Sequence, residues 1–237
     1  MSIDIFRLYW FVDEFSKNYK KLEKANSVSK KGTRNREIRP SLSELLTIVI
    51  MFGFSPIKNF KLYYTKYIPM KFQGYFTELS YSRMVELLPR LMVPLSILLH
   101  CMEGRKTGIY FADSTKIAVC HNKRINQNKV FKDLAKMSKS TMGWFFGFKL
   151  HMIINDRGEI MAVKITQGNV DDREPMPSLL DGLKGLCFAD KGYVKAELFS
   201  ELYKKGVKLI TPIKDKMKNK LMLINEKFLL KKGSMTF

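Results

Sequence analysis

The order of apolar segments after residue 106 most limits what this chain can fold into. Segments rich in β-branched and aromatic residues predict strands at 107–115, 142–155, 159–168, 185–190 and 207–213. Helical patterns separate the last three of these strands, at 171–183 and 194–206. Three successive strands, followed by strands that alternate with helices, predict a mixed sheet with helices packed on it.

The phrase Phe-Ala-Asp occurs at the ends of two of these predicted strands. It places Asp113 at the end of the first strand and Asp190 at the end of the fourth. A single aspartate at a strand end is most often a cap or turn residue, but two in matched contexts favour a shared site. If the two strands are parallel neighbours, both carboxylates emerge at one edge of the sheet, where α/β proteins bind ligands.

Paired carboxylates repel each other unless a cation compensates their charge. Mg²⁺ prefers oxygen ligands and is often held by one or two carboxylates together with water and phosphate. The chain also carries 42 Lys and Arg against 22 Asp and Glu, a net charge of +20. A basic protein with an acidic metal site suits a phosphodiester substrate, which predicts a metal-dependent nuclease or nucleotidyl transferase.

The basic residues gather in three segments, at 30–39, 121–140 and 214–220. One interpretation is that they form solvated faces without a partner. The other is a phosphate-binding surface, because the Asn, Gln and Ser residues among them also donate hydrogen bonds to phosphate oxygens. The size of the charge excess favours the second interpretation.

Residues 1–106 have helical patterns. The segment 4–25 is amphipathic, and Ser41 with Glu44 forms the signature of a capping box. Further helices are predicted at 57–67 and 82–101. We therefore expect two domains: a helical N-terminal region, 1–106, with a DNA-binding role, and an α/β domain, 107–237.

The segments FADST, CHNKR, VFKDLA, MGWFFGFKLHMIINDRGEI, TQGNVDDR, ADKGY and LITPIKDKMKNKLM follow one another in an order that resembles bacterial insertion-sequence transposases of the DDE type. The resemblance covers roughly 42–232 and is densest from 107 onward. It implies an α/β (α+β) catalytic domain with a ribonuclease H-like mixed sheet and flanking helices. It also implies double-stranded DNA as the partner and a homodimer as the working form.

The same resemblance implies roles for the two aspartates. Asp113 and Asp190 would be catalytic residues that bind two Mg²⁺ or Mn²⁺ ions, first for phosphodiester hydrolysis at the element's end and then for strand transfer by the freed 3′-hydroxyl. The family's third acid, a glutamate, is expected at about Phe237 or just beyond, so none is expected within the chain. Glu226 comes too early in the sequence to replace it.

These implications leave two functions open. One is a DNA transposase that is inactive here because the third acid is missing. The alternative is a catalytically silent DNA-binding remnant that inhibits a full-length transposase. A basic RNA-binding protein without a metal site is a third and weaker interpretation.

Several other residues are candidates for contact with DNA. Lys149 and His151 share one face of a predicted strand and either look toward the site or play a structural part. Lys123, Arg124 and Lys191 are candidate phosphate contacts. Asp171 and Asp172 are expected to cap the next helix, and the aromatic run from Trp144 to Phe148 is expected to be buried rather than to stack on bases.

The remaining features concern the cellular location. The three cysteines show no metal-binding or disulfide spacing. The longest apolar run, 45–54, is too short to span a bilayer, and the N-terminus lacks the pattern of a signal peptide. We expect no membrane partner and a location in a bacterial cytoplasm, on the nucleoid.

Overall fold

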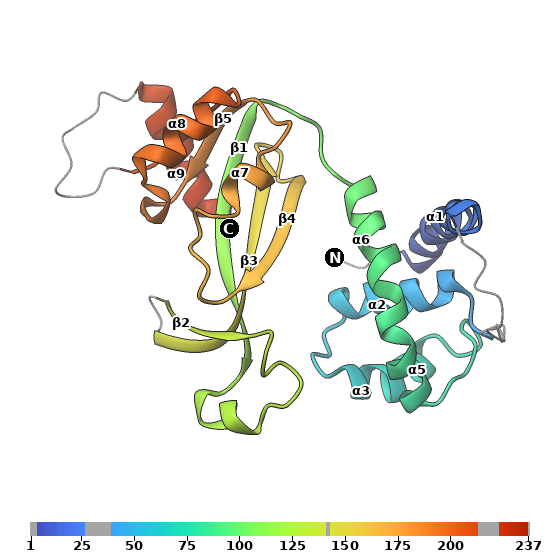
Figure 1. The fold of residues 1–237 in the computed structure, drawn as a ribbon. Coiled ribbons are helices and arrows are strands. Elements are labelled where there is room, and N and C mark those ends of the chain that lie inside the picture. Colours follow the sequence, from blue (N-terminus) through green and yellow to red (C-terminus); the bar gives the residue numbers. More distant parts are fainter. Residues whose placement is uncertain (1–3, 27–38, 141–142, 213–222, 237) are drawn as a thin grey trace. The chain divides into compact units, whose positions relative to one another are not determined.

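The computed structural model describes residues 4–26, 39–140, 143–212 and 223–236, with side chains up to Lys231. The chain divides into two compact units, residues 1–101 and 102–237. Figure 1 shows the helices of the first unit and the sheet of the second.

The N-terminal unit is helical, as predicted. Its elements are α1 (Ile5–Asn26), α2 (Leu42–Phe54), α3 (Phe60–Leu62), the π-helical turn η1 (Tyr63–Tyr67), α4 (Ile68–Lys71), α5 (Tyr81–Leu87), the 3₁₀ turn η2 (Leu88–Leu91) and α6 (Met92–Cys101). Its core includes Val12 of α1, Leu46 of α2, Tyr63 of η1 and Met84 of α5, all fully buried. Residues from every part of the unit therefore meet in one apolar core.

The predicted capping box of α2 is confirmed, and it has a further partner. The Glu44 main-chain N–H donates to the Ser41 hydroxyl at 3.1 Å, and the Ser41 N–H donates to Glu44 Oε2 at 2.6 Å. Glu44 Oε1 accepts from both the N–H and the hydroxyl of Thr77, at 2.8 and 2.9 Å. The carboxylate therefore ties the start of α2 to a loop 33 residues away.

Replacing Glu44 with alanine is expected to destabilise the protein at pH 7 by about 1–2 kcal/mol. Burial opposes ionisation of Glu44, but hydrogen bonds from Ser41 and Thr77 outweigh it and hold the pKa below 4.5. This stabilisation is present above pH 4.5 and is lost as the pH falls through the lowered folded-state pKa. Urea unfolding at pH 7 and pH 3 should show the difference from wild type shrinking in acid. An equal difference in the free energy of unfolding at both pH values would contradict the prediction. So would an equally large loss of stability in the control Glu23→Ala, which changes an exposed glutamate.

One helical stretch of the described residues, Tyr81–Cys101, is long and apolar enough to cross a membrane by length and composition alone. It comprises α5, η2 and α6, and Pro89 lies in the 3₁₀ turn between the two α-helices. Leu87 and Leu91 from this stretch are buried in the core of the N-terminal unit. Core helices pass the same test, so the stretch is weak evidence for a membrane span.

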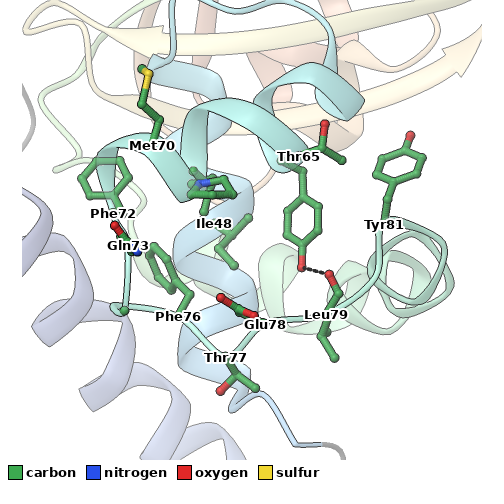
Figure 2. A pocket seen from close by; sticks show the side chains of 14 residues that line it. Ile48, Thr65, Met70, Phe72, Gln73, Phe76, Thr77, Glu78, Leu79 and Tyr81 are labelled. Carbon is green, nitrogen blue, oxygen red and sulfur yellow. Dashed lines mark hydrogen bonds between the residues drawn. The ribbon is translucent and has the colours of Figure 1, made fainter.

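The N-terminal unit also contains a pocket of about 640 Å³, which Figure 2 shows from close by. Its walls come from α4, the loop after it and neighbouring helices, and include Ile68, Phe72 and Phe76. The Tyr64 hydroxyl donates to the Leu79 carbonyl at 3.1 Å across one side. None of the predicted site residues lines this pocket.

The second unit is built on a mixed sheet. Its strands are β1 (Ile109–Cys120), β2 (Lys136–Ser140), β3 (Gly143–Asn155), β4 (Ile160–Gln167), β5 (Gly185–Ala189) and β6 (Val207–Ile210), in the order β2-β3-β1-β5-β6, with β4 also paired to β3. Strand β3 is antiparallel to β1, β2 and β4, whereas β5 is parallel to both β1 and β6. The predicted fold class, a mixed sheet with helices packed on it, is confirmed.

Each face of this sheet has its own core. The α7/α8 face, covered by α7 (Met176–Leu179) and α8 (Ala196–Lys204), includes Tyr110, Ala112, Ile153, Cys187 and Leu209. The α9 face, covered by α9 (Ile224–Thr236), includes Phe111, Ile154, Phe188 and Ile210. Successive residues of a strand alternate between the two faces, so the face of a strand residue follows from its number.

Two local expectations were wrong. Strand β2 lies in the basic segment 121–140, where no strand was predicted. The helix expected at 171–183 is the single turn α7, which has Pro175 at its N-cap. Asp171 instead pairs with Arg173, and Asp172 pairs with Lys149 on β3, so neither aspartate caps the helix.

Candidate functional site

The repeated phrase Phe-Ala-Asp is aligned residue by residue in the structure. In the parallel pair of β1 and β5, Phe111 lies opposite Phe188 and Ala112 opposite Ala189. The two phenylalanine rings are 5.6 Å apart between centroids on the α9 face. Asp113 and Asp190 are the next residues along each chain, where the parallel pairing of β1 with β5 ends. Asp190 follows the last residue of β5, but Asp113 lies within β1, which continues to Cys120 alongside β3, so the expectation that Asp113 ends its strand was wrong.

The two aspartates are held in the same local way. The Ser114 N–H donates to Asp113 Oδ1 at 2.8 Å, and the Lys191 N–H donates to Asp190 Oδ1 at 2.6 Å. Asp190 is the N-cap of the 3₁₀ turn η4 (Lys191–Tyr193). In each case a main-chain donor holds one carboxylate oxygen. The described residues show no hydrogen bond to the other oxygen of either aspartate.

The electrostatics show that the two charges interact. Burial raises the pKa of Asp113, the Ser114 N–H partly offsets this rise, and the negative charges of Asp190 and Asp172 add to it. Asp113 is half-buried and Asp190 is exposed. The edge therefore holds like charges whose repulsion a bound cation would relieve.

The donor chemistry of this edge fits a hard divalent cation. The oxygens without a hydrogen-bond partner are carboxylate oxygens, which Mg²⁺ and Mn²⁺ prefer. Among the described residues, no group of three or more His, Cys, Asp or Glu is placed to hold a metal ion. Mg²⁺ is often held by only one or two carboxylates, with water or phosphate as its other ligands.

Glu226 does not join this pair. Its carboxylate contacts Lys208 Nζ at 2.5 Å, and Lys208 lies opposite Leu186 at the amino-terminal end of the parallel strands. Leu186 pairs with Ile109, four residues before Asp113, so the main chain of Lys208 lies about 13 Å from that of Asp113, measured along the strands. Position 237, where the family's third acid was expected, falls outside the described residues.

Lys149 and His151 lie on the α7/α8 face, because His151 pairs with Ser114 rather than with Asp113. Lys149 Nζ contacts Asp172 Oδ1 at 3.0 Å and donates to the Val170 carbonyl at 2.9 Å. These contacts fix the loop after β4 to the middle of β3. They occupy the Lys149 ammonium, which is mostly covered in this arrangement.

His151 is 2% exposed, which leaves no surface for direct contact with DNA. Its Nε2 bonds to the Thr166 hydroxyl at 2.8 Å, and its Nδ1 lies 4.0 Å from Asp172 Oδ1 without a hydrogen bond. Burial lowers the pKa of His151 although Asp172 acts in the opposite direction, so the ring is neutral at pH 7. The structural interpretation of Lys149 and His151 thus replaces the interpretation as DNA contacts.

Lys123 and Arg124 lie in the 3₁₀ turn η3 (Asn122–Gln127), within a segment that we call the basic ribbon, residues 114–140. The ribbon contains seven Lys and Arg residues and one acid, Asp133. In Figure 1 it extends beyond the part of the sheet that the helices flank. Lys123 and Arg124 are both exposed there.

The aromatic run next to the ribbon is only partly buried. Phe145 and Phe146 are buried, as expected, whereas Trp144 is 60% exposed. Trp144 pairs with Lys139 of β2, and its carbonyl accepts a hydrogen bond from Asn122 at 2.9 Å. The expectation of burial was therefore wrong for Trp144, whose side chain is mostly exposed to solvent.

Comparisons with known proteins agree with the resemblance in the sequence. The family model described as a transposase DDE domain matches residues 103–236. A search of curated proteins gives no match. A solved structure, a piggyBac transposase synaptic complex with hairpin DNA, is similar with a TM-score of 0.47 and 9% identity, over 90% of this chain and 51% of its own. The chain thus spans about half the length of that transposase. Since the family model covers more than half of the chain, the protein belongs to the transposase DDE domain family.

Proposed function

We propose that this protein is a DNA transposase of an insertion sequence, which hydrolyses and transfers phosphodiester bonds at Asp113 and Asp190. The observation that carries the proposal is the parallel pairing of β1 with β5, which aligns the residues just before these two aspartates, in a chain of the transposase DDE domain family. Family members use divalent metal ions, and we propose Mg²⁺ or Mn²⁺ here. The DNA would be double-stranded, the working form a homodimer, and the location the bacterial cytoplasm.

The residues of the chain have defined tasks in this proposal. Asp113 and Asp190 hold the cation with the oxygen that no main-chain group occupies, while the N–H groups of Ser114 and Lys191 keep each carboxylate oriented. A divalent cation bound there supplies Lewis-acid activation of water and stabilises charge at a phosphodiester. We also propose Lys191, the residue after Asp190, as a phosphate contact.

The basic ribbon is the proposed contact surface for the DNA backbone. Its Lys and Arg side chains are solvent-exposed at Lys116, Lys123, Arg124, Lys129, Lys132, Lys136 and Lys139. Such residues neutralise phosphates and release counterions, which makes binding salt-dependent. The N-terminal unit, with its own basic residues, is proposed as a second DNA-binding region.

Reversing two charges of the ribbon, Lys123→Glu with Arg124→Glu, is expected to weaken binding to duplex DNA. The slope of log affinity against log salt should fall by about 2, because two phosphate contacts are lost. Fluorescence anisotropy with a labelled duplex, at several salt concentrations, measures both effects. The control is Lys204→Glu with Lys205→Glu at the end of α8, which changes the net charge equally. Equal losses in both double variants would show that only the total charge matters.

Metal-dependent nicking of a supercoiled plasmid tests the catalytic part of the proposal. We expect nicking in Mg²⁺ or Mn²⁺, none in EDTA, and none in the Asp190→Asn variant, which should still bind DNA. A second function, DNA binding without cleavage that inhibits an active relative, is favoured by the two-acid edge in the described residues. Salt-dependent DNA binding by a wild-type protein that does not nick in either metal would select this alternative.

A further inference from the structure

Trp144 is a large aromatic side chain that the fold leaves open to solvent. It is the second residue of β3, and 60% of its surface is exposed, whereas the next two residues, Phe145 and Phe146, are buried. The buried pair anchors the strand, so the indole is fixed at its root and open elsewhere. A tryptophan held in this way offers a large, rigid contact surface that loses little entropy when a ligand binds.

Cations flank Trp144 on both sides of its strand. On the β2 side it pairs with Lys139, so the two side chains lie next to each other on one face. On the β1 side, the Asn122 amide donates to the Trp144 carbonyl at 2.9 Å. Asn122 begins η3, and this contact holds the turn that carries Lys123 and Arg124 beside the strand. All three cationic side chains are exposed.

The surroundings of the indole select the class of ligand. The basic ribbon carries seven Lys and Arg residues against one acid, so its partner is a polyanion. A polyanion that also has flat aromatic groups is a nucleic acid, and aromatic side chains stack on bases of any sequence. In an intact duplex each base is covered on both faces by its neighbours. Only a base that has left the stack is open to the indole.

We propose that Trp144 is the stacking site for an unpaired DNA base, with Lys139 and the Lys123–Arg124 pair on the phosphates beside it. This inference deepens the proposed contact of the basic ribbon with DNA and rests on it. Trp144 is eight residues from Met152, the partner of Asp113 in the pairing of β1 with β3, so the two positions lie about 26 Å apart along the strand. The indole is therefore a binding residue away from the metal site, and the ribbon binds single-stranded DNA through it.

Replacing Trp144 with alanine is expected to weaken the binding of single-stranded DNA selectively. The affinity for a short, labelled oligo(dT) strand, measured by fluorescence anisotropy, should fall about tenfold, because stacking on one base is lost. The affinity for a blunt duplex should change by less than about twofold, since its base faces are covered. Trp144→Phe, which keeps an aromatic ring, should bind oligo(dT) within about threefold of wild type. Circular dichroism melting checks that neither change at this exposed position unfolds the protein.

The emission of the indole gives a second measure of stacking. The chain has two tryptophans, Trp10 and Trp144, so Trp10→Phe leaves Trp144 as the single emitter. A stacked base quenches indole fluorescence, so oligo(dT) should lower the emission of this protein saturably, and a blunt duplex should have little effect. The matched control for affinity is Tyr203→Ala on α8, which removes another exposed aromatic ring, next to Lys204 and Lys205. It should leave both affinities unchanged.

The outcomes separate this inference from the proposed function. If Lys123→Glu with Arg124→Glu weakens DNA binding while Trp144→Ala binds oligo(dT) like wild type, the stacking site is wrong and the ribbon stands as a DNA contact. Equal losses for oligo(dT) and duplex in Trp144→Ala would also overturn it, since the indole would then contact the backbone. A shift of the Trp144 emission with vesicles of anionic phospholipid, but not with DNA, would assign the surface to a membrane instead. If the wild type binds neither form of DNA, the stacking site and the proposed function both fail.

Discussion

Asp113→Asn should make the metal-free protein more stable and abolish its response to Mn²⁺. Burial and the charge of Asp190 disfavour the ionised Asp113 carboxyl. Asparagine removes the charge but keeps an oxygen that accepts from the Ser114 N–H. We therefore expect a melting temperature about 2–4 °C higher than that of wild type at pH 7 without metal. Wild type should melt at a higher temperature when Mn²⁺ is added, and the variant should not.

Thermal melts with and without Mn²⁺ measure both parts of this result. The control is Asp181→Asn, which removes a carboxylate from an exposed turn of the same unit. It should change neither the stability nor the response to the metal. A variant at position 113 that is less stable than wild type without metal would show that Asp113 serves the fold rather than a ligand. The expected result, a variant that gains stability and loses metal binding, is common at binding sites, where function costs stability.

Gly147→Ala should be strongly damaging to the second unit. Gly147 lies in β3 between Ala118 of β1 and Lys136 of β2. A Cβ atom there would stand 2.0 Å from the Ile117 carbonyl oxygen, so main chain would have to move. We expect a loss of about 3 kcal/mol or more in the free energy of unfolding, together with weaker DNA binding, because the base of the basic ribbon is displaced.

Urea unfolding of this variant can be compared with Gly192→Ala. A Cβ at Gly192 meets no atom within 4 Å, and its backbone does not require glycine. This control should differ from wild type by less than about 0.5 kcal/mol. If Gly147→Ala had the same free energy of unfolding as Gly192→Ala, the main chain around Gly147 would have room for a Cβ atom after a small shift, and the prediction would be wrong.

The sequence predicts those parts of the fold in which the local residue pattern and the contact with a distant segment favour the same structure. The two Phe-Ala-Asp phrases favoured a shared site on the condition that their strands are parallel neighbours, and β1 and β5 meet this condition, with Phe111 opposite Phe188. Strand β2 was missed because its sequence, KMSKS, has no apolar alternation. It forms a strand only because β3 offers a free edge.

The errors around the candidate site have a similar cause. Asp171 and Asp172 have the residue type and spacing of helix caps, but Lys149 is 23 residues earlier in the chain and draws Asp172 to β3. The burial of His151 could not be predicted, because the loop that brings Asp172 near it cannot be placed from local periodicity.

The pairing of β1 with β5 has a consequence for the order in which the protein forms. Asp113 and Asp190 are 77 residues apart in sequence, and the whole ribbon, β3, β4 and α7 lie between them. Closing a loop of this length is slow compared with forming the β3–β4 hairpin, so β5 should dock late in folding. During synthesis, the acidic edge cannot exist until Asp190 has left the ribosome, when the ribbon is already complete. Under the proposed function, a nascent chain would therefore hold DNA before it could act on it.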